Sequence, residues 1–224
     1  MIQEIIQAIL SISLTNEGSN TQATSSNHEG SCFSIIQRFF QPITLSPVNF
    51  RSFIRQNGHN LCGHSDDSLN RSCIPSIPIT NNSLNLEIDQ NYMILQPAGS
   101  QNFPDGMMVR LDGNNNLQMV YIECKQLIPK FNNNPPKMNK NCIYICGNKI
   151  FNGYLLTTPE WQDKKDEFIR RYNLLAEEFT TEDMRIIPYR VIEPRWIDDR
   201  GTQCFIDREE QNIPLIDETL SRFY

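Results

Sequence analysis

Two carboxylates and one lysine lie within a short stretch of the sequence, FPDGMMVRLDGNNNLQMVYIECKQ, at residues 103–126. Asp105 follows a proline just before one strand-like run, and Glu123 and Lys125 lie near the end of the next run. Side chains alternate between the two faces of a strand, so Glu123 and Lys125 point the same way and Cys124 points the opposite way. If the two runs pair, Asp105 comes close to the Glu123–Lys125 pair.

This combination of groups has the parts that phosphodiester hydrolysis needs. Two carboxylates suit a hard, oxygen-seeking cation such as Mg²⁺, which also binds phosphate oxygens. A neighbouring ammonium can stabilise the charge of the transition state and help to orient or deprotonate the attacking water. The alternative is a surface hairpin whose Glu123 and Lys125 form an ion pair of little consequence.

A β-hairpin is the element that must position these groups. The runs Met107–Leu111 and Leu117–Lys125 are rich in β-prone residues and are joined by DGNNN. An Asp-Gly pair between two such runs is a strong hairpin signal. On the second strand Tyr121 shares the face of Glu123, whereas Val120 and Ile122 share the face of Cys124, which is therefore expected to be a small buried hydrophobe.

The pattern of Pro104-Asp105 followed by Glu123-Cys124-Lys125 resembles the signature of the PD-(D/E)XK nuclease superfamily. The segment after it, PKFNNNPPKMNKNCIYICG, is similar to the asparagine-proline loop and tyrosine-bearing strand of many Type II restriction endonucleases. The resemblance covers residues 96–158. It implies that Asp105 and Glu123 are ligands of Mg²⁺, that Lys125 is the catalytic lysine, and that the core has the order αβββαβ.

The sequence departs from the family pattern at one position and leaves one acid unassigned. Gly106 stands where an apolar residue more often follows the acid, and we expect it to loosen the local backbone. Many relatives also have an acid on an N-terminal helix. Here Glu29 or Glu4 could supply it, and the sequence does not choose between them.

Charge is sorted along the chain. The net charge is −6, which argues against a general nucleic-acid binder, yet residues 31–65 and 124–159 contain no Asp or Glu and eight Arg or Lys in all. Such sorting can present one positive face to a polyanion. The second of these segments directly follows the catalytic strand, so we predict that its lysines contact DNA phosphates and that its asparagines read base edges. The predicted DNA contacts are Lys130, Asn132, Asn133, Asn134, Lys137 and Lys140; a solvated loop is the alternative.

The remaining elements predict an α/β fold with a mixed central sheet flanked by helices. The expected helices are 2–14, 31–41 and Pro159–Phe179, with a polar loop over 15–30; further strands are expected over 141–147, buried on both faces, and 185–193. The chain is expected to be a single nuclease domain, 1–224, with the catalytic core at 96–192. Residues 42–91 show no firm periodicity and are expected to form an irregular inserted lobe with short strands or turns, a candidate for DNA recognition.

Part of that lobe has the residue types that zinc prefers. His59, Cys62, His64 and Cys73 lie in HNLCGHSDDSLNRSC, and mixed His and Cys ligands suit Zn²⁺. Their spacing is none of the usual zinc-finger or zinc-ribbon patterns, so a polar loop, with or without contact to DNA, is the alternative to structural zinc.

These observations predict a Mg²⁺-dependent, site-specific double-stranded DNA endonuclease of the Type II kind, leaving 5′-phosphate and 3′-hydroxyl ends. A homodimer is expected, because two-fold symmetry in the protein matches a palindromic site. A DNA-binding module without catalysis and a structure-specific DNA repair nuclease are the alternatives. Seven cysteines at irregular spacing without a secretory signal predict reduced thiols in the cytoplasm, and no apolar run is long enough for a membrane.

Overall fold

The structure is a computed structural model of the chain. It describes residues 2–11, 21–43, 45–61, 73–99, 103–125, 131–133, 137–157, 196–198 and 209–223, together with single positions between 159 and 174. Among these residues, no helix is long and apolar enough to cross a membrane.

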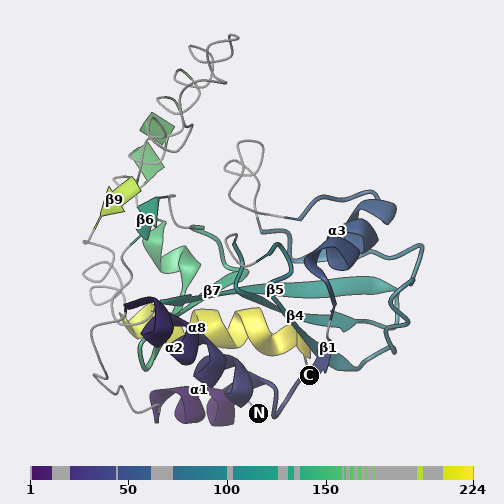
Figure 1. Cartoon of the computed structure of the whole chain (residues 1–224), viewed down its shortest axis with the longest axis horizontal. Coiled ribbons are helices and arrows are strands. Elements are labelled where there is room, and N and C mark those ends of the chain that lie inside the picture. The colour runs from purple at the N-terminus through teal and green to yellow at the C-terminus, as the bar shows by residue number, and fades with distance from the viewer. Residues whose placement is uncertain are drawn as a thin grey trace.

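A mixed sheet of seven strands forms the centre of the molecule, and six of them run in the order β1-β3-β4-β5-β7-β8 (Figure 1). The strands are β1 (Gln41–Ile43), β2 (Ser76–Pro78), β3 (Asn91–Leu95), β4 (Gly106–Leu111), β5 (Asn116–Lys125), β7 (Cys142–Cys146) and β8 (Lys149–Asn152). The pairs β1–β3 and β5–β7 are parallel, and the other neighbours are antiparallel. The short β2 pairs with the first residues of β5, on the edge that β7 uses further along.

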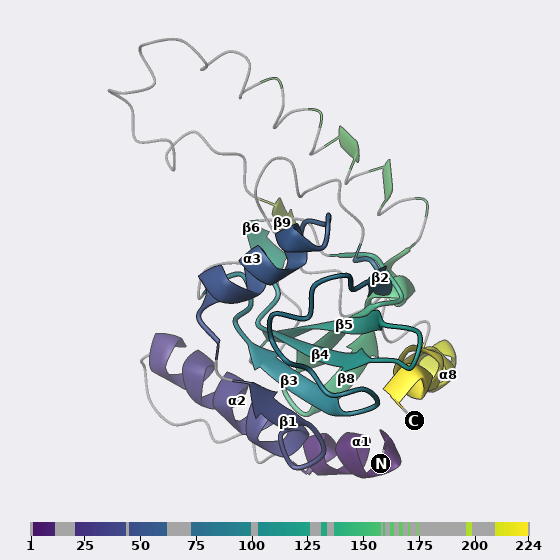
Figure 2. The same cartoon turned by 90° about the vertical axis from the view of Figure 1, so that its right-hand side faces the viewer.

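Helices cover both faces of the sheet. Helix α3 (Pro47–Gln56) lies over one face, and α1 (Ile2–Leu10), α2 (Thr21–Ile36) and α8 (Glu209–Leu220) lie on the other side (Figure 1; Figure 2). Two 3₁₀ turns, Gly153–Leu156 and Ser221–Phe223, follow β8 and α8. The protein therefore has a mixed α/β architecture with a flanked open sheet, as the sequence predicted.

The strands alternate between two hydrophobic clusters, one on each face. In β5, Met119 and Tyr121 pack in the cluster under α3, whereas Val120 and Ile122 pack in the cluster with α1, α2 and α8. Cys124 is partly buried against that second cluster. The predicted faces of β5 are therefore confirmed: Glu123 and Lys125 continue the α3 side, and Cys124 faces the α2 side.

The predicted hairpin is confirmed, and an aspartate organises its turn. The Asp112 carboxylate accepts the main-chain N–H groups of Asn114 and Asn116, at 2.9 and 2.8 Å. Asn115, not the glycine, takes the left-handed conformation, with φ of 58°. The strand predicted over 141–147 is observed as β7, and all five of its residues are buried, as expected for an inner strand.

Three predictions about the N-terminal half were wrong or incomplete. The loop predicted over 15–30 is helical from Thr21 onward, as the first part of α2. The helix predicted over 31–41 ends at Ile36, because the chain turns there and enters β1 at Gln41. The helix predicted over 2–14 is described only as α1 and ends at Leu10.

The segment 42–91 contains a helix that was not predicted. It contains α3, which begins where the Ser46 side chain accepts the Asn49 N–H at 3.3 Å and where Pro47 occupies the first turn. It also contributes β2 and most of β1 to the central sheet. The described residues of this segment therefore contribute strands to the central sheet and a helix over one of its faces, and residues 62–72 lie outside the described residues.

Several predicted elements fall partly or wholly outside the described residues. The strand over 185–193 lies outside them, and the helix over Pro159–Phe179 is described only at single positions, such as Gln162 and Asp166, which are helical. Two short strands, β6 (Phe131–Asn133) and β9 (Trp196–Asp198), pair as a small separate sheet.

Candidate active site

The Asp105 side chain is bound to the main chain of β5. Its Oδ2 accepts the Cys124 N–H at 2.7 Å. The last ladder pair between β4 and β5 is Gly106 with Ile122, so the Asp105 carboxylate takes the place of the next rung of the ladder. The structure thus brings Asp105 to the segment that carries Glu123 and Lys125, as the hairpin predicted.

Glu123 and Lys125 form a close ion pair, with Nζ and Oε1 2.5 Å apart. The Glu123 side chain is only 9% exposed, whereas that of Lys125 is 29% exposed. The second carboxylate oxygen of Glu123, Oε2, is buried and has no hydrogen-bond partner among the described residues. A buried charged oxygen without a partner is costly, so the pair is more than an incidental surface contact.

The electrostatics of the site are those of crowded carboxylates. Burial, and then the charge of Glu123, raise the pKa of Asp105 to about 7, although the Cys124 N–H and the Lys125 ammonium oppose the shift. Burial alone would lower the pKa of Lys125, but the charge of Glu123 and its hydrogen bond raise that pKa above its ordinary value. Lys125 is therefore an ammonium, and one ammonium is too little to balance the acids around it.

A third acid, Glu29 on α2, belongs to the same electrostatic group. Its charge raises the pKa of Asp105, and the charge of Glu123 in turn raises the pKa of Glu29 after the larger effect of burial. The Glu29 carboxylate accepts a hydrogen bond from the Gln96 side chain at 3.4 Å. Glu4, the other acid that the sequence left open, is exposed on α1. The structure therefore favours Glu29 over Glu4.

Gly106 lets α2 approach the strand beside Asp105. A Cβ at this position would lie 2.6 Å from the Phe33 ring and 2.6 Å from the Met93 methyl group. We expected the glycine to loosen the backbone, and that interpretation was wrong: Gly106 is buried and tightly packed. Its lack of a side chain makes room for Phe33, four residues after Glu29 on the same helix.

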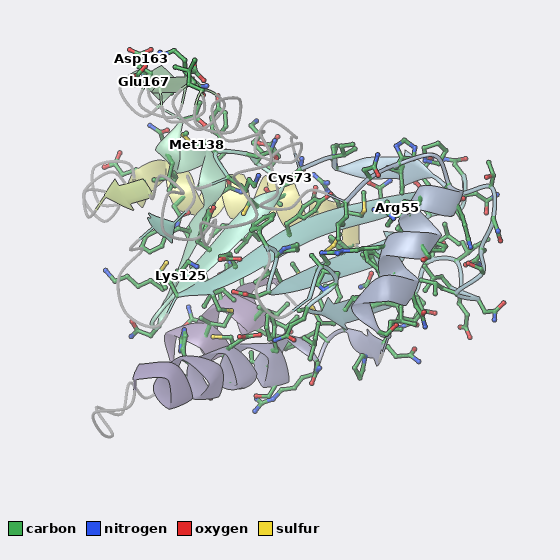
Figure 3. The ribbon with its side chains drawn as sticks, turned by 45° about the horizontal axis from the view of Figure 1, so that its top comes forward. Arg55, Cys73, Lys125, Met138, Asp163 and Glu167 are labelled. Carbon is green, nitrogen blue, oxygen red and sulfur yellow. The ribbon has the colours of Figure 1, made fainter. Side chains whose placement is uncertain are left out.

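Aromatic rings and a second lysine support the site from the α3 side. Phe103 stacks on Tyr121 with ring centroids 6.0 Å apart, and the Lys137 ammonium lies 5.8 Å from the centre of the Phe103 ring. Tyr144 lies beside Glu123 in the β5–β7 register, and its hydroxyl accepts the Lys137 N–H at 2.7 Å. Lys125 itself lies at one end of the sheet, well away from Arg55 of α3 (Figure 3).

The two carboxylates of the site fit Mg²⁺ better than they fit a metal ion whose ligands all come from the protein. Within the described ranges, no three or more His, Cys, Asp or Glu side chains are grouped to hold a metal ion. Mg²⁺ commonly binds one or two carboxylates and completes its shell with water and substrate phosphates. Asp105 and Glu123 meet that requirement, and a cation would satisfy Oε2 of Glu123, for which the placed residues offer no hydrogen-bond partner.

The zinc prediction receives no support from the positions that can be placed. Cys73 is buried in the hydrophobic cluster under α3, and His59 follows the end of that helix. Cys62 and His64 lie outside the described residues. The buried position of Cys73 is that of a core residue.

The predicted DNA contacts are placed unevenly. Lys137 is 4% exposed, so its side chain lies in the interior, whereas Lys140 is on the surface and pairs with Glu218 at 3.1 Å. Asn132 and Asn133 lie in β6, paired with β9, and Lys130 and Asn134 lie outside the described residues. Contact of this segment with DNA stays a prediction.

Comparisons with known proteins give no match. No protein-family model, curated protein or solved structure is similar enough to the chain to count as one. Any assignment of function therefore rests on the residues and geometry described above. Of the residues in that geometry, Gln96 was not predicted from the sequence, because no motif marks a glutamine in the turn before Asp105.

Proposed function

We propose that the protein is a Mg²⁺-dependent, site-specific endonuclease of double-stranded DNA, with Asp105, Glu123 and Lys125 as its catalytic residues. The observation that carries the proposal is the convergence of these three groups at the end of one hairpin, where a buried oxygen of Glu123 has no hydrogen-bond partner in the part of the chain that the structure describes. The strand order around the hairpin, β3-β4-β5-β7, is compatible with the αβββαβ core that the sequence resemblance implies.

Asp105 and Glu123 would hold the Mg²⁺ ion, which would supply positive charge to the scissile phosphate and lower the pKa of a bound water. Lys125 lies beside Glu123, so we assign it charge stabilisation at the phosphate and the orientation or deprotonation of the attacking water. Attack of the water on phosphorus breaks the bond to the 3′ oxygen; the water gives up one proton, and the leaving oxygen takes one up to become a hydroxyl. The products are a 5′-phosphate and a 3′-hydroxyl.

We further propose that the enzyme acts as a homodimer on a palindromic site. Each copy contributes one complete set of the three residues, and each cuts one strand of the duplex. The two-fold axis of the dimer would then coincide with the axis of the site, so that symmetric half-sites meet identical protein surfaces.

Incubation of the full-length protein with a supercoiled plasmid and Mg²⁺ tests this function. Discrete bands are the expected result, and a smear would indicate a nuclease without sequence preference. If the plasmid stays intact at every Mg²⁺ concentration while the protein still binds DNA, the endonuclease is refuted and a DNA-binding module is favoured.

Matched substitutions assign the activity to the site. Asp105→Asn, Glu123→Gln and Lys125→Met should each abolish cleavage, because each removes one charge from a site with few others. Glu87→Gln and Lys149→Met remove an exposed carboxylate and an exposed ammonium elsewhere, and both should cleave like the wild type. Cleavage that persists in EDTA would exclude the metal-dependent reaction.

A further inference from the structure

The turn that follows β3, residues 96–99, is bound to Asp105 and to helix α3. Gln96 donates its main-chain N–H to the Asp105 carbonyl at 2.7 Å, and the Gly99 N–H closes the turn on the Gln96 carbonyl at 2.9 Å. Arg51 of α3 donates to the Ala98 carbonyl from the other side of the sheet. Residues 96–99 are thus fixed against Asp105, the first residue of the candidate site.

Gln96 is held in a conformation that a glutamine rarely adopts. Its φ is 45°, in the left-handed region, which costs a residue with a Cβ free energy relative to ordinary backbone. Such a conformation persists where surrounding contacts fix it, and here it lets the main chain and the side chain of one residue serve two different partners.

The second partner is Glu29. The Gln96 side-chain amide donates to Glu29 Oε1 at 3.4 Å, joining α2 to the turn. Glu29 is half-buried, and burial and the charge of Glu123 both disfavour its ionised form, whereas the Gln96 hydrogen bond favours it. Among the described residues, the Gln96 amide is the hydrogen-bond donor that holds the Glu29 carboxylate in place.

We propose that Gln96 is a positioning residue of the candidate active site, which fixes the main chain before Asp105 and holds Glu29 as a third carboxylate near the cation. This proposal rests on the proposed function in one respect, namely that Asp105 and Glu123 bind a divalent cation. Glu29 would act on the water shell of the cation, since the described carboxylates do not form a three-ligand cage. Loss of a residue that acts on the surroundings of a bound metal, and not on the ion itself, commonly weakens metal affinity or activity by about 10- to 100-fold.

The test measures Mn²⁺ binding to the full-length protein by calorimetry, with the electron paramagnetic resonance of free Mn²⁺ as a second readout. Gln96→Met keeps the length of the side chain and the main-chain N–H but removes the amide, and we expect about tenfold weaker Mn²⁺ binding. Gln118→Met is the matched control. Gln118 also donates to a carboxylate, that of Asp112 at 2.9 Å, but at the opposite end of the hairpin. Its Mn²⁺ affinity should equal that of the wild type.

A double-mutant cycle separates positioning from a general structural effect. If Gln96 acts through Glu29, Gln96→Met should have little effect on Mn²⁺ affinity in a Glu29→Gln background. The melting temperature in EDTA should be similar in Gln96→Met and Gln118→Met. Unchanged affinity in Gln96→Met, a full effect that persists in the Glu29→Gln background, or a wild type without saturable Mn²⁺ binding would each overturn the proposal.

Plasmid cleavage measured in parallel keeps the two proposals apart. A wild type that binds Mn²⁺ but leaves DNA intact would refute the nuclease, while the comparison of Gln96→Met with its control would still decide the role of Gln96. A wild type that cuts DNA, with a Gln96→Met variant that binds Mn²⁺ equally well, would leave the nuclease standing and remove Gln96 from the site.

Discussion

Lys125→Met should destabilise the metal-free protein, because it leaves the buried Glu123 carboxylate without its cation. The two charged atoms are 2.5 Å apart, which corresponds to a gross attraction of about 7 kcal/mol at an effective dielectric constant of about 20. Removing one partner of a buried pair typically costs about 3–5 kcal/mol. Lys125 is 29% exposed, so water partly replaces it, and we expect a loss of about 2–4 kcal/mol.

Thermal unfolding in EDTA measures this loss. For a chain of 224 residues, each kcal/mol shifts the melting temperature by about 2–4 °C, so the expected decrease is about 5–15 °C. Adding Glu123→Gln to Lys125→Met should recover most of the stability, because the buried charge is then gone. Lys149→Met, at an exposed position on β8, is the control and should change the melting temperature little.

A loss in Lys125→Met no larger than that of Lys149→Met would refute the reasoning. Glu123 would then not depend on Lys125 for its charge, and the pair would be the inconsequential surface contact that the sequence left open. A large loss that Glu123→Gln fails to recover would point instead to lost packing of the lysine side chain.

Three further predictions concern other features of the site and its surroundings. The pKa of Asp105 is raised from an ordinary 3.8 to about 7, so the folded state binds the proton more tightly than the unfolded state. In urea titrations, the metal-free wild type should therefore lose stability relative to Asp105→Asn, by at most about 4 kcal/mol, as the pH rises from about 4 to about 7. A stability difference that does not change with pH would contradict the shift. Gly106→Ala should lower the free energy of unfolding by about 1–3 kcal/mol in the same assay, because the added Cβ meets Phe33 and Met93. Gly113→Ala is the control and should be close to neutral, because its Cβ meets nothing within 4 Å. Equal effects of the two substitutions would mean that the packing beside Asp105 is loose. Lys130→Ala and Lys140→Ala should each lower the slope of the log binding constant against log salt by about 0.9, and an unchanged slope would place the loop away from DNA. Replacing Asn132–Asn134 with Ala should cost about 1–3 kcal/mol of discrimination between DNA sites for each lost base contact. Lys137→Ala should instead lower the melting temperature, because the Lys137 ammonium lies over the Phe103 ring.

The hairpin was predictable because its signals are local. An Asp-Gly turn between two β-prone runs fixes the pairing, and strict alternation then fixes which side chains share a face with Glu123. The buried strand β7 was likewise visible as a short, continuous apolar run. The position of each strand could be read from a few neighbouring residues, whereas the partners of β7 could not.

The elements that were missed depend on tertiary contacts or on weak signals. The first part of α2, TQATSSNHEG, has no hydrophobic period, and α8 contains Pro214 in its interior, where proline normally opposes a helix. Helix α3 does have a local signal, Ser46 followed by Pro47, but it stands in a segment otherwise rich in Asn, Ser and Pro. Long-range packing decides such cases more than propensity does.

The same distinction applies to the site. Asp105, Glu123 and Lys125 are marked by spacing on one hairpin, whereas the choice of Glu29 over Glu4 requires knowledge of which helix lies beside β5. Gln96 is 67 residues from Glu29, and only the folded chain brings its amide to that carboxylate.

The hydrogen bond between Asp105 and the Cys124 N–H has a consequence for how this site can vary. The donor belongs to the main chain, so every residue except proline can supply it, and the side chain at position 124 is left to serve the opposite face of the sheet. Substitutions of Cys124 should therefore be limited by packing against α2 and not by the chemistry of the site. Replacing the Cys124 amide with an ester would remove the N–H while keeping every side chain, and is thus the direct way to separate the acid from its strand.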